Sequence, residues 1–311
     1  MWLIIILLML MEVGFCPGIF NIGDFPPVIA PDFKIYNIVR PYFRIDILFW
    51  SSRPKTLSLK DFSNKAELFL NQNIMIMRLL LISNSTNAGE EYLKYPIGDI
   101  GKFLSCANEV VFIPYAAVTF SYDEYEAKVQ SRFNEIDIAV RSIHKFPDPV
   151  QAIKNAEAIV VGGGNTFALT KKMQEQGLMG AIWERIREGV PYVGWSAGSN
   201  VTCPTICTTN DMPIVEPESF KAIGAVKFQI NPHYLDANPE GHAGETREQR
   251  LEEYIAANPD MFVVGLREGC YLKVEGDRLS YKTFKDKTLR IFKYGQKPYE
   301  LKEGDDLSFL M

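Results

Sequence analysis

Short apolar runs that alternate with amphipathic stretches, from Met77 onward, constrain the fold of this chain most strongly. The apolar runs lie at residues 79–82, 110–114, 138–143, 158–161 and 191–195. Several are apolar at consecutive positions, which is typical of strands that are covered on both faces. Helices are expected between them, at residues 122–136, 148–156, 165–176 and 178–188. The alternation predicts an α/β fold, a mostly parallel sheet with helices on both faces.

The end of the chain has a different character. Residues 271–279 read as a hairpin, which we expect at the edge of the fold. In parallel sheets of this kind, ligands bind beyond the carboxyl ends of the strands. The residues that directly follow each apolar run are therefore the first candidates for a functional site.

The N-terminal residues stand apart from this pattern. Residues 2–11 are all apolar, but ten helical residues span only about 15 Å, about half of a bilayer core. No Lys or Arg precedes this run, and the proline after Cys16 makes a poor signal cleavage site. We expect residues 1–76 to be an extension that the fold does not need and residues 77–311 to form the functional domain. An export or membrane signal at residues 2–11 is the alternative.

Composition excludes several classes of protein. With 47% hydrophobic and 23% charged residues, the chain has the composition of a globular protein. A net charge of −5 gives no sign of nucleic-acid binding. Five cysteines without a CxxC pair indicate reduced thiols and a cytoplasmic location. Pro204 lies between Cys203 and Cys207 and no histidine cluster joins them, so no metal site is expected. Monomer and homodimer both fit the sequence.

A run of three glycines, residues 162–164, follows one of the expected strands and precedes an expected helix. Backbone N–H groups in such a turn approach a ligand closely, and the helix N-terminus behind them favours negative charge. The turn suits a phosphate cradle or an oxyanion hole, or it is simply a tight connection. It lacks the Lys-Ser/Thr ending of a nucleotide P-loop and the spacing of a dinucleotide fingerprint.

A G-x-S-x-G motif at residues 194–198 follows another expected strand. In a nucleophile elbow of this form, the serine occupies a strained turn that exposes its Oγ. A short helical stretch follows the motif, and Pro204 should end it. This context makes Ser196 the candidate nucleophile.

A serine nucleophile needs a base and an orienting carboxylate. The three histidines are His144, His233 and His242. His144 follows an expected strand, and His233 follows residues 228–230, which also read as the end of a strand, so these two rank equally, ahead of His242. Asp211 lies between Ser196 and His233, in the chain order Ser–Asp–His that is known for triads. Competing carboxylates are Glu216, Glu245 and Glu268.

Several motifs in one register resemble peptidase E, the α-aspartyl dipeptidase family. They are residues 81–86, 161–167, 194–200, 208–215, 231–233, 240–242 and 244–248. The resemblance runs from about Met77 to the C-terminus and leaves residues 1–76 outside.

The resemblance implies a fold like class I glutamine amidotransferases, a flavodoxin-like three-layer sandwich, with a serine where those enzymes have cysteine. It implies Ser196 as nucleophile, His233 as base and Asp211 as third triad member, with Glu268 as the alternative for that third role. It also implies cleavage of Asp-Xaa dipeptides with neither metal nor cofactor. Cys207 stands where bacterial members carry arginine, which puts substrate affinity in doubt but not the chemistry.

In the mechanism that we expect, the backbone N–H of Ala197 and one from the Gly163–Gly164 turn bind the oxyanion. The aspartyl carboxylate of the substrate needs a cation, and Arg247 and Arg250 share one helix face. Their alternative interpretation is a solvated face paired with neighbouring glutamates.

Two other functions fit the same motifs. One is a different hydrolase on the same elbow, an esterase or a cyanophycinase-like peptidase. The other is a non-enzymatic module that binds a nucleotide at the glycine turn and leaves Ser196 inert.

Overall fold

The computed structural model describes residues 34–40, 43–49, 77–237, 244–284 and 286–311. The chain divides into two units, residues 1–74 and 75–311. In the first unit, strands β1 (Lys34–Arg40) and β2 (Phe43–Phe49) form an antiparallel pair. The apolar run at residues 2–11 lies outside the described residues, and the role of residues 1–76 stays a prediction.

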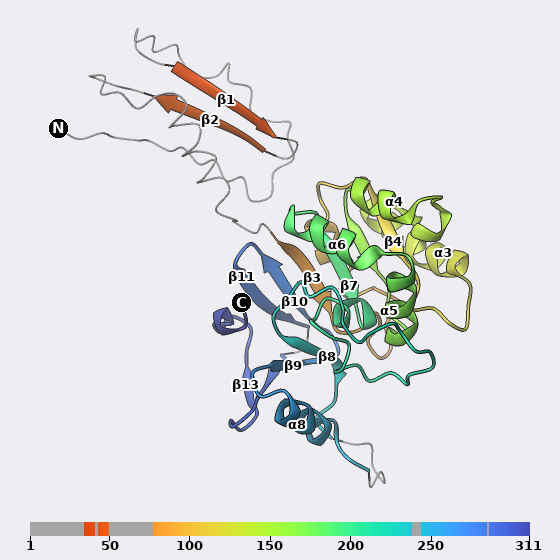
Figure 1. The fold of residues 1–311 in the computed structure, drawn as a ribbon, viewed down its shortest axis with the longest axis vertical. Helices are drawn as coiled ribbons and strands as arrows, with labels where there is room; N and C mark the ends of the chain where they lie inside the picture. The colour runs from red at the N-terminus through yellow and green to blue at the C-terminus, as the bar shows by residue number, and fades with distance from the viewer. Residues whose placement is uncertain (1–33, 41–42, 50–76, 238–243, 285) are drawn as a thin grey trace, which may run out of the picture. The chain divides into compact units, whose positions relative to one another are not determined.

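A seven-stranded sheet forms the centre of the second unit, in the order β11-β10-β3-β7-β6-β4-β5 (Figure 1). Its strands are β3 (Arg78–Ile82), β4 (Glu109–Ile113), β5 (Ala139–Ser142), β6 (Ile159–Val161), β7 (Tyr192–Trp195), β10 (Cys270–Glu275) and β11 (Arg278–Thr283). Strands β3 to β7 are parallel, and the β10–β11 hairpin adds to β3 antiparallel. The predicted strands and the edge hairpin are confirmed.

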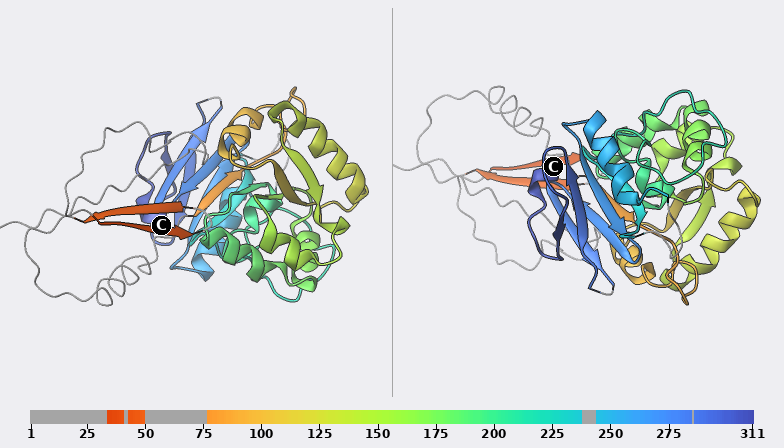
Figure 2. Two further views of the ribbon diagram at one scale, coloured as in Figure 1. Left: turned by 90° about the horizontal axis from the view of Figure 1, so that it is seen from above. Right: turned by 90° about the horizontal axis from the view of Figure 1, so that it is seen from below.

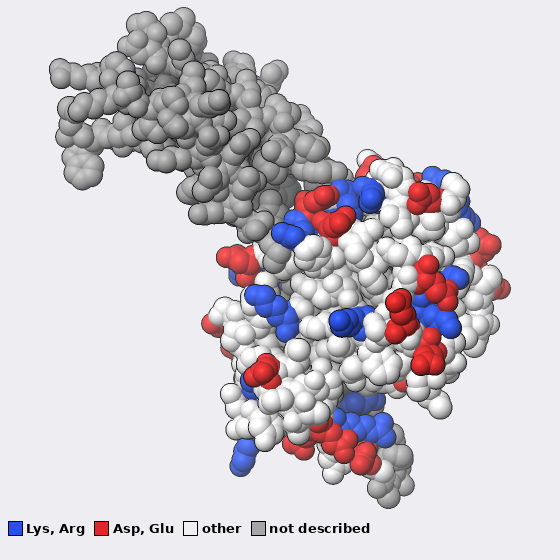
Figure 3. All heavy atoms as spheres, in the orientation of Figure 1, with Lys and Arg blue, Asp and Glu red and all other residues white. Residues whose placement is uncertain are grey.

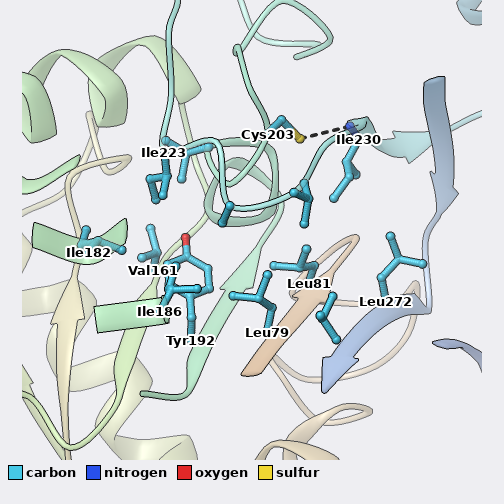
Figure 4. Packing of buried hydrophobic residues seen from close by; sticks show 14 of the residues in the cluster. Leu79, Leu81, Val161, Ile182, Ile186, Tyr192, Cys203, Ile223, Ile230 and Leu272 are labelled. Carbon is cyan, nitrogen blue, oxygen red and sulfur yellow. Dashed lines mark hydrogen bonds between the residues drawn. The ribbon is translucent and has the colours of Figure 1, made fainter. Parts of the chain in front are cut away.

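Helices cover both faces of this sheet (Figure 2). They are α2 (Ile97–Phe103), α3 (Tyr122–Phe133), α4 (Pro149–Asn155), α5 (Thr166–Glu175) and α6 (Leu178–Arg187). Three short 3-10 helices also occur, η2 (Asn134–Ile136), η3 (Ile143–Lys145) and η4 (Ser308–Leu310). Along β3, Leu79 packs into a core with α4 to α6, while Leu80 packs into a second core with α2 and α3. Figure 4 shows the first of these cores. The predicted α/β class, a mostly parallel sheet with helices on both faces, is confirmed.

The helices begin where the sequence places capping residues. Ser121 and Glu124 form a capping box at α3, and Asp148 caps α4, whose first residue is proline. Asn165, directly after the glycine turn, caps α5 by accepting a hydrogen bond from the N–H of Ala168. This cap fixes the glycine turn to the start of a helix, where backbone N–H groups are available to a ligand.

A second, four-stranded sheet has the order β13-β12-β9-β8, and the sequence analysis did not predict it. Its strands are β8 (Gln229–Tyr234), β9 (Phe262–Arg267), β12 (Leu289–Lys293) and β13 (Tyr299–Leu301). Helix α8 (Arg247–Ala257) packs on it through Leu251 and Ile255, which contact a small core that includes Tyr234. Strands β8 and β9 are parallel, so their carboxyl ends lie side by side.

The face of the molecule drawn in Figure 3 carries basic and acidic side chains intermixed over the described residues. None of the helices in the described part has the length and apolar character that crossing a bilayer requires.

A charge cluster ties together three strands of the four-stranded sheet. The Glu300 carboxylate on β13 accepts hydrogen bonds from Arg267 Nη1 on β9 at 2.9 Å and from Arg290 Nη1 on β12 at 2.8 Å. Burial on its own would raise the pKa of Glu300, but hydrogen bonds from Arg267, Thr288 and Arg290 outweigh it and lower the pKa to about 2. The charged form of Glu300 therefore stabilises the fold.

We expect Glu300→Gln to lower the free energy of unfolding by about 1–2 kcal/mol at pH 7, a value discounted because this side chain is 34% exposed. A lowered pKa stabilises above the unfolded-state pKa, so the difference from wild type should shrink as the pH falls from 4.5 toward 2. Urea unfolding at several pH values measures it, with the exposed Glu252→Gln as control. A difference that stays constant down to pH 3 would contradict the role of this charge.

Candidate active site

Ser196 lies in a sharp turn between strand β7 and helix α7 (Ala197–Asn200). Its backbone has φ 54° and ψ −113°, a strained conformation for a residue with a side chain. The turn is held by the Ser196 N–H, which donates to the carbonyl of Ile82 on β3 at 3.0 Å. A Cβ on Gly194 would overlap the carbonyl of Gly198, so the motif needs glycine there. This is the geometry of a nucleophile elbow.

The Ser196 hydroxyl meets a histidine and, behind it, a glutamate. Ser196 Oγ lies 2.8 Å from Nε2 of His233, and Nδ1 of His233 lies 2.7 Å from Oε1 of Glu268. An ionised carboxylate only accepts hydrogen bonds, so Nδ1 carries the proton and Nε2 is left to accept from the serine. The His233 and Glu268 side chains are 38% and 42% exposed, which leaves the site open to a small molecule.

The position of His233 depends on a contact between the two sheets. His233 lies near the end of β8 with φ 53°, at a register shift between Pro232 and Tyr234. Its N–H donates to Ser83 Oγ at 2.9 Å, and Ser83 Oγ donates to the carbonyl of Leu266 at 2.7 Å. The buried Ser83 hydroxyl thus joins the strand of His233 to the strand that precedes Glu268. The sequence analysis did not single out Ser83, although its place directly after an expected strand was a signal for it.

Asp211, the expected third triad member, lies in a different environment. Its Oδ2 accepts hydrogen bonds from the N–H of Thr166 at 2.8 Å, from Thr166 Oγ1 at 2.6 Å and from Thr209 Oγ1 at 3.1 Å. These bonds attach the loop around Asp211 to the first residue of α5. The carboxylate beside His233 Nδ1 is that of Glu268, the alternative, so the expectation that Asp211 lies there is wrong; which of the two carboxylates serves the reaction stays a prediction.

None of the other candidate residues that the structure describes has a hydrogen bond to Ser196. His144 contacts Ser142 Oγ through Nδ1 at 2.6 Å and Asp123 through Nε2 at 3.2 Å. Glu216 and Glu245 are exposed. His242 lies outside the described residues. Of the two histidines that the sequence ranked equally, the structure brings His233 to the serine.

The glycine turn borders the nucleophile. A Cβ on Gly163 would lie 3.0 Å from the Cβ of Ser196, so no other residue fits this approach without a shift. Gly164 has φ +136°, and a Cβ there would overlap the carbonyl of Ala116. The turn therefore places the Gly163 backbone next to Ser196.

The two candidate arginines differ sharply in environment. The Arg247 guanidinium is half-buried at the start of α8; burial and the neighbouring charge of Arg250 lower its pKa, whereas Tyr234 and Asp211 raise it. Its Nη1 is buried and has no hydrogen-bond partner among the described residues. Arg250 is 65% exposed and lies 3.8 Å from the carboxylate of Glu245, as expected for a solvated helix face. A buried N–H without an acceptor indicates a place for an anion.

Two of the described cysteines differ in environment. Cys203 is buried and accepts a hydrogen bond on Sγ from the Ile230 N–H at 3.2 Å (Figure 4), and burial raises its pKa to about 12. Cys207 is exposed. Within the described ranges, no group of three or more His, Cys, Asp or Glu side chains has the arrangement of a metal site.

The chain is similar to a known family and to named proteins. Residues 79–282 match the sequence model of peptidase family S51. A protein named Peptidase E from Nostoc sp. is 50% identical over 238 residues, which cover 76% of this chain and 98% of that protein. A protein named Peptidase E from Escherichia coli O6:K15:H31 is 44% identical over 228 residues, which cover 73% of this chain and 99% of that protein.

A solved structure shares the fold. The crystal structure of a peptidase from an acI-B1 Actinobacterium superposes with a TM-score of 0.55 at 18% identity, over 75% of this chain and 97% of that one. At this identity, the likeness bears on the fold alone.

Proposed function

The chain belongs to peptidase family S51 and is a serine-type dipeptidase, and from this premise we propose that it hydrolyses dipeptides with an N-terminal aspartate through Ser196, His233 and Glu268. The observation that carries the proposal is the chain of two hydrogen bonds, 2.8 Å from Ser196 Oγ to His233 Nε2 and 2.7 Å from His233 Nδ1 to Glu268.

In the first step, Ser196 Oγ attacks the peptide carbonyl while its proton passes to Nε2 of His233. Glu268 accepts the hydrogen bond from Nδ1, so it holds the imidazole in the required tautomer and stabilises the imidazolium that forms. His233 then gives the proton to the leaving amine, and the aspartyl group stays on Ser196 as an ester. Water, deprotonated by the same imidazole, hydrolyses the ester and releases aspartate.

The tetrahedral intermediate needs donors for its negative oxygen. In the proposal these are the N–H of Ala197, at the start of α7, and the N–H of Gly164. The close approach of the Gly163 backbone to Ser196 supports this assignment. Removing one such donor typically costs about 3–4 kcal/mol of barrier.

Arg247 is the proposed partner of the substrate's aspartyl carboxylate. Its buried Nη1 lacks an acceptor among the described residues, and its pKa responds to Tyr234, next to His233 in the chain, and to Asp211, next to the glycine turn. A substrate carboxylate would supply the missing acceptor and the missing counter-charge. Arg250 is exposed and paired with Glu245, so it is not proposed for this role.

We expect Arg247→Met to lower kcat/KM for Asp-Leu by about 10- to 100-fold, because it removes a charge-assisted contact worth about 1.5–3 kcal/mol. Hydrolysis of Asn-Leu should change little, so the ratio between the two substrates should fall. Methionine keeps much of the volume of the arginine stem. Steady-state kinetics of the full-length chain on Asp-Leu, Asn-Leu, Leu-Leu and β-Asp-Leu measures the effect.

Arg250→Met is the matched control, since it removes the same charge three residues along the same helix and should leave the Asp-Leu to Asn-Leu ratio unchanged. Equal ratios in wild type and Arg247→Met would place the specificity cation elsewhere. Wild-type hydrolysis of Leu-Leu as fast as of Asp-Leu would overturn the aspartate specificity itself.

We also propose that the enzyme acts in the cytoplasm, which cell fractionation would test. The thiols of Cys203, Cys207 and Cys270 are unpaired in the described part of the chain, which suits a reducing compartment.

A further inference from the structure

The glycine turn beside Ser196 rests on a buried tyrosine that the proposed reaction does not use. Tyr125, on α3, is 3% exposed and packs edge-to-face on Phe112 of β4. Its hydroxyl donates to the carbonyl oxygen of Gly163 at 2.9 Å. A Cβ on Gly162 would lie 2.7 Å from the Tyr125 oxygen, so the phenol lies directly against the turn.

The hydrogen bonds of Tyr125 determine which group its hydroxyl proton is donated to. Trp195 Nε1 donates to the Tyr125 oxygen at 3.2 Å, and Tyr92 donates to the same oxygen at 3.4 Å. A phenol has one proton and two lone pairs, so both lone pairs accept and the proton is committed to Gly163. Burial raises the pKa of Tyr125, so the hydroxyl keeps this proton at neutral pH.

The bond to Gly163 fixes the direction of a neighbouring N–H. The peptide unit between Gly163 and Gly164 is planar and trans, because the described residues contain no cis peptide bond. In a trans peptide the C=O and the following N–H point in opposite directions. A Gly163 carbonyl held toward Tyr125 therefore turns the Gly164 N–H away from Tyr125. Glycine backbone has little resistance to rotation of its own. The N–H groups of Gly162 and Asn165 are held on either side of the turn, and the Tyr125 hydroxyl holds the carbonyl between them.

We propose that Tyr125 is a positioning residue that aims the Gly164 N–H at the oxyanion, acting through the Gly163 carbonyl. The inference rests on the proposed role of Ser196 and adds to it the group that holds one oxyanion donor in place. Trp195 directly precedes the nucleophile and donates to the same phenol, so one hydrogen-bonded cluster connects the elbow and the glycine turn. Such preorganised donors stabilise the transition state more than the ground state.

The test compares Tyr125→Phe with wild type in the full-length chain. Phenylalanine keeps the ring and its packing and removes only the hydroxyl. With Asp-Leu, kcat should fall about 10- to 100-fold, less than for complete loss of an oxyanion donor, and KM should change less than about twofold. An aspartic α-aldehyde forms a hemiacetal with Ser196 whose oxygen occupies the oxyanion position. Its inhibition constant should rise by the same factor as kcat falls, whereas that of aspartate, which forms no such adduct, should stay constant.

Tyr122→Phe makes the same change three residues earlier on α3 and should behave as wild type in kcat, KM and both inhibition constants. Unchanged aldehyde inhibition in folded Tyr125→Phe would overturn the inference, as would equal weakening of aldehyde and aspartate, which indicates a general loss of structure. If Tyr125→Phe loses its cooperative unfolding transition, Tyr92→Phe decides instead. It keeps Tyr125 and removes one donor to its oxygen, which weakens the phenol as a donor.

For Tyr92→Phe, a parallel loss of about two- to fivefold in kcat and aldehyde affinity supports the inference, and no change in either overturns it. A wild-type chain that neither cleaves Asp-Leu nor binds the aldehyde would reject the proposed function, and this inference with it. If the wild-type chain cleaves Asp-Leu and binds the aldehyde, and Tyr125→Phe and Tyr92→Phe do so equally well, only the inference about Tyr125 is rejected.

Discussion

Replacing either Ser196 or His233 with alanine is expected to lower kcat for Asp-Leu by about a millionfold, because each removes the whole nucleophilic step. The two side chains share one hydrogen bond of 2.8 Å, through which the proton leaves the serine. They act as a unit, so the double variant should be little worse than either single variant. Burst and steady-state kinetics of the three purified proteins measure this, with thermal unfolding to show that each is folded.

Two substitutions of the same kind serve as controls. Ser131→Ala changes an exposed serine on α3, and His144→Ala changes a histidine whose ring nitrogens contact Ser142 and Asp123. Both should keep wild-type turnover. More than a few per cent of activity in Ser196→Ala would identify a different nucleophile. Losses that add up in the double variant would mean that Ser196 and His233 act in separate steps.

The seven-stranded sheet was predictable because its parallel strands and the helices between them are each marked by neighbouring residues in the sequence. Each parallel strand is a short apolar run that is buried on both faces, and capping residues such as Ser121 and Asp148 begin the next helix. The four-stranded sheet was not predicted as a sheet, although the residues before His233 indicated one of its strands. Strand β8 contains Pro232 and polar residues, and its neighbour β9 begins 28 residues after β8 ends, by the bounds Gln229–Tyr234 and Phe262–Arg267. Its pairing depends on contacts between distant segments, which periodicity does not reveal.

The candidate site likewise contains one residue that adjacent positions predict and others that only the pairing of distant strands brings together. The prediction of Ser196 as the nucleophile came from five adjacent residues that follow a strand. His144 and His233 could not be separated by position, because both end expected strands, and only the family resemblance favoured His233. The parallel pairing of Tyr234 with Arg267 places the residues next to them, His233 and Glu268, at one edge of the sheet.

The third triad role was the hardest to read from the sequence. Chain order favoured Asp211, since it lies between Ser196 and His233. The order of residues along a chain carries no information about which carboxylate reaches an imidazole, whereas the β8–β9 pairing brings Glu268 to His233. Arg247 and Arg250 were likewise equivalent on a helical wheel, and only the burial of Arg247 distinguishes them.

Glu268→Gln is expected to lower kcat about 100- to 10,000-fold with little change in KM. The amide cannot carry the negative charge that stabilises imidazolium, and its NH2 group favours the wrong tautomer of His233. The lower end of the range applies because Glu268 is 42% exposed, so a glutamine has room to turn its oxygen toward Nδ1. Asp211→Asn should cost less, about tenfold, since its carboxylate holds Thr166 and Thr209 and not the base. The reverse ranking in kcat would return the third role to Asp211.

Measuring Glu268→Gln and Asp211→Asn in the His233→Ala variant, which lacks the base, separates their effects on the base from effects on folding. If Glu268 acts through the His233 imidazole, then adding Glu268→Gln to His233→Ala removes nothing further, and the double variant should have the residual rate of His233→Ala alone. Asp211→Asn acts through the loop beside the glycine turn, so its smaller effect should persist in the same background. A Glu268→Gln effect that keeps its full size without His233 would mean that this carboxylate contacts the substrate directly, and the hydrogen bond of 2.7 Å to Nδ1 would then be incidental to the reaction.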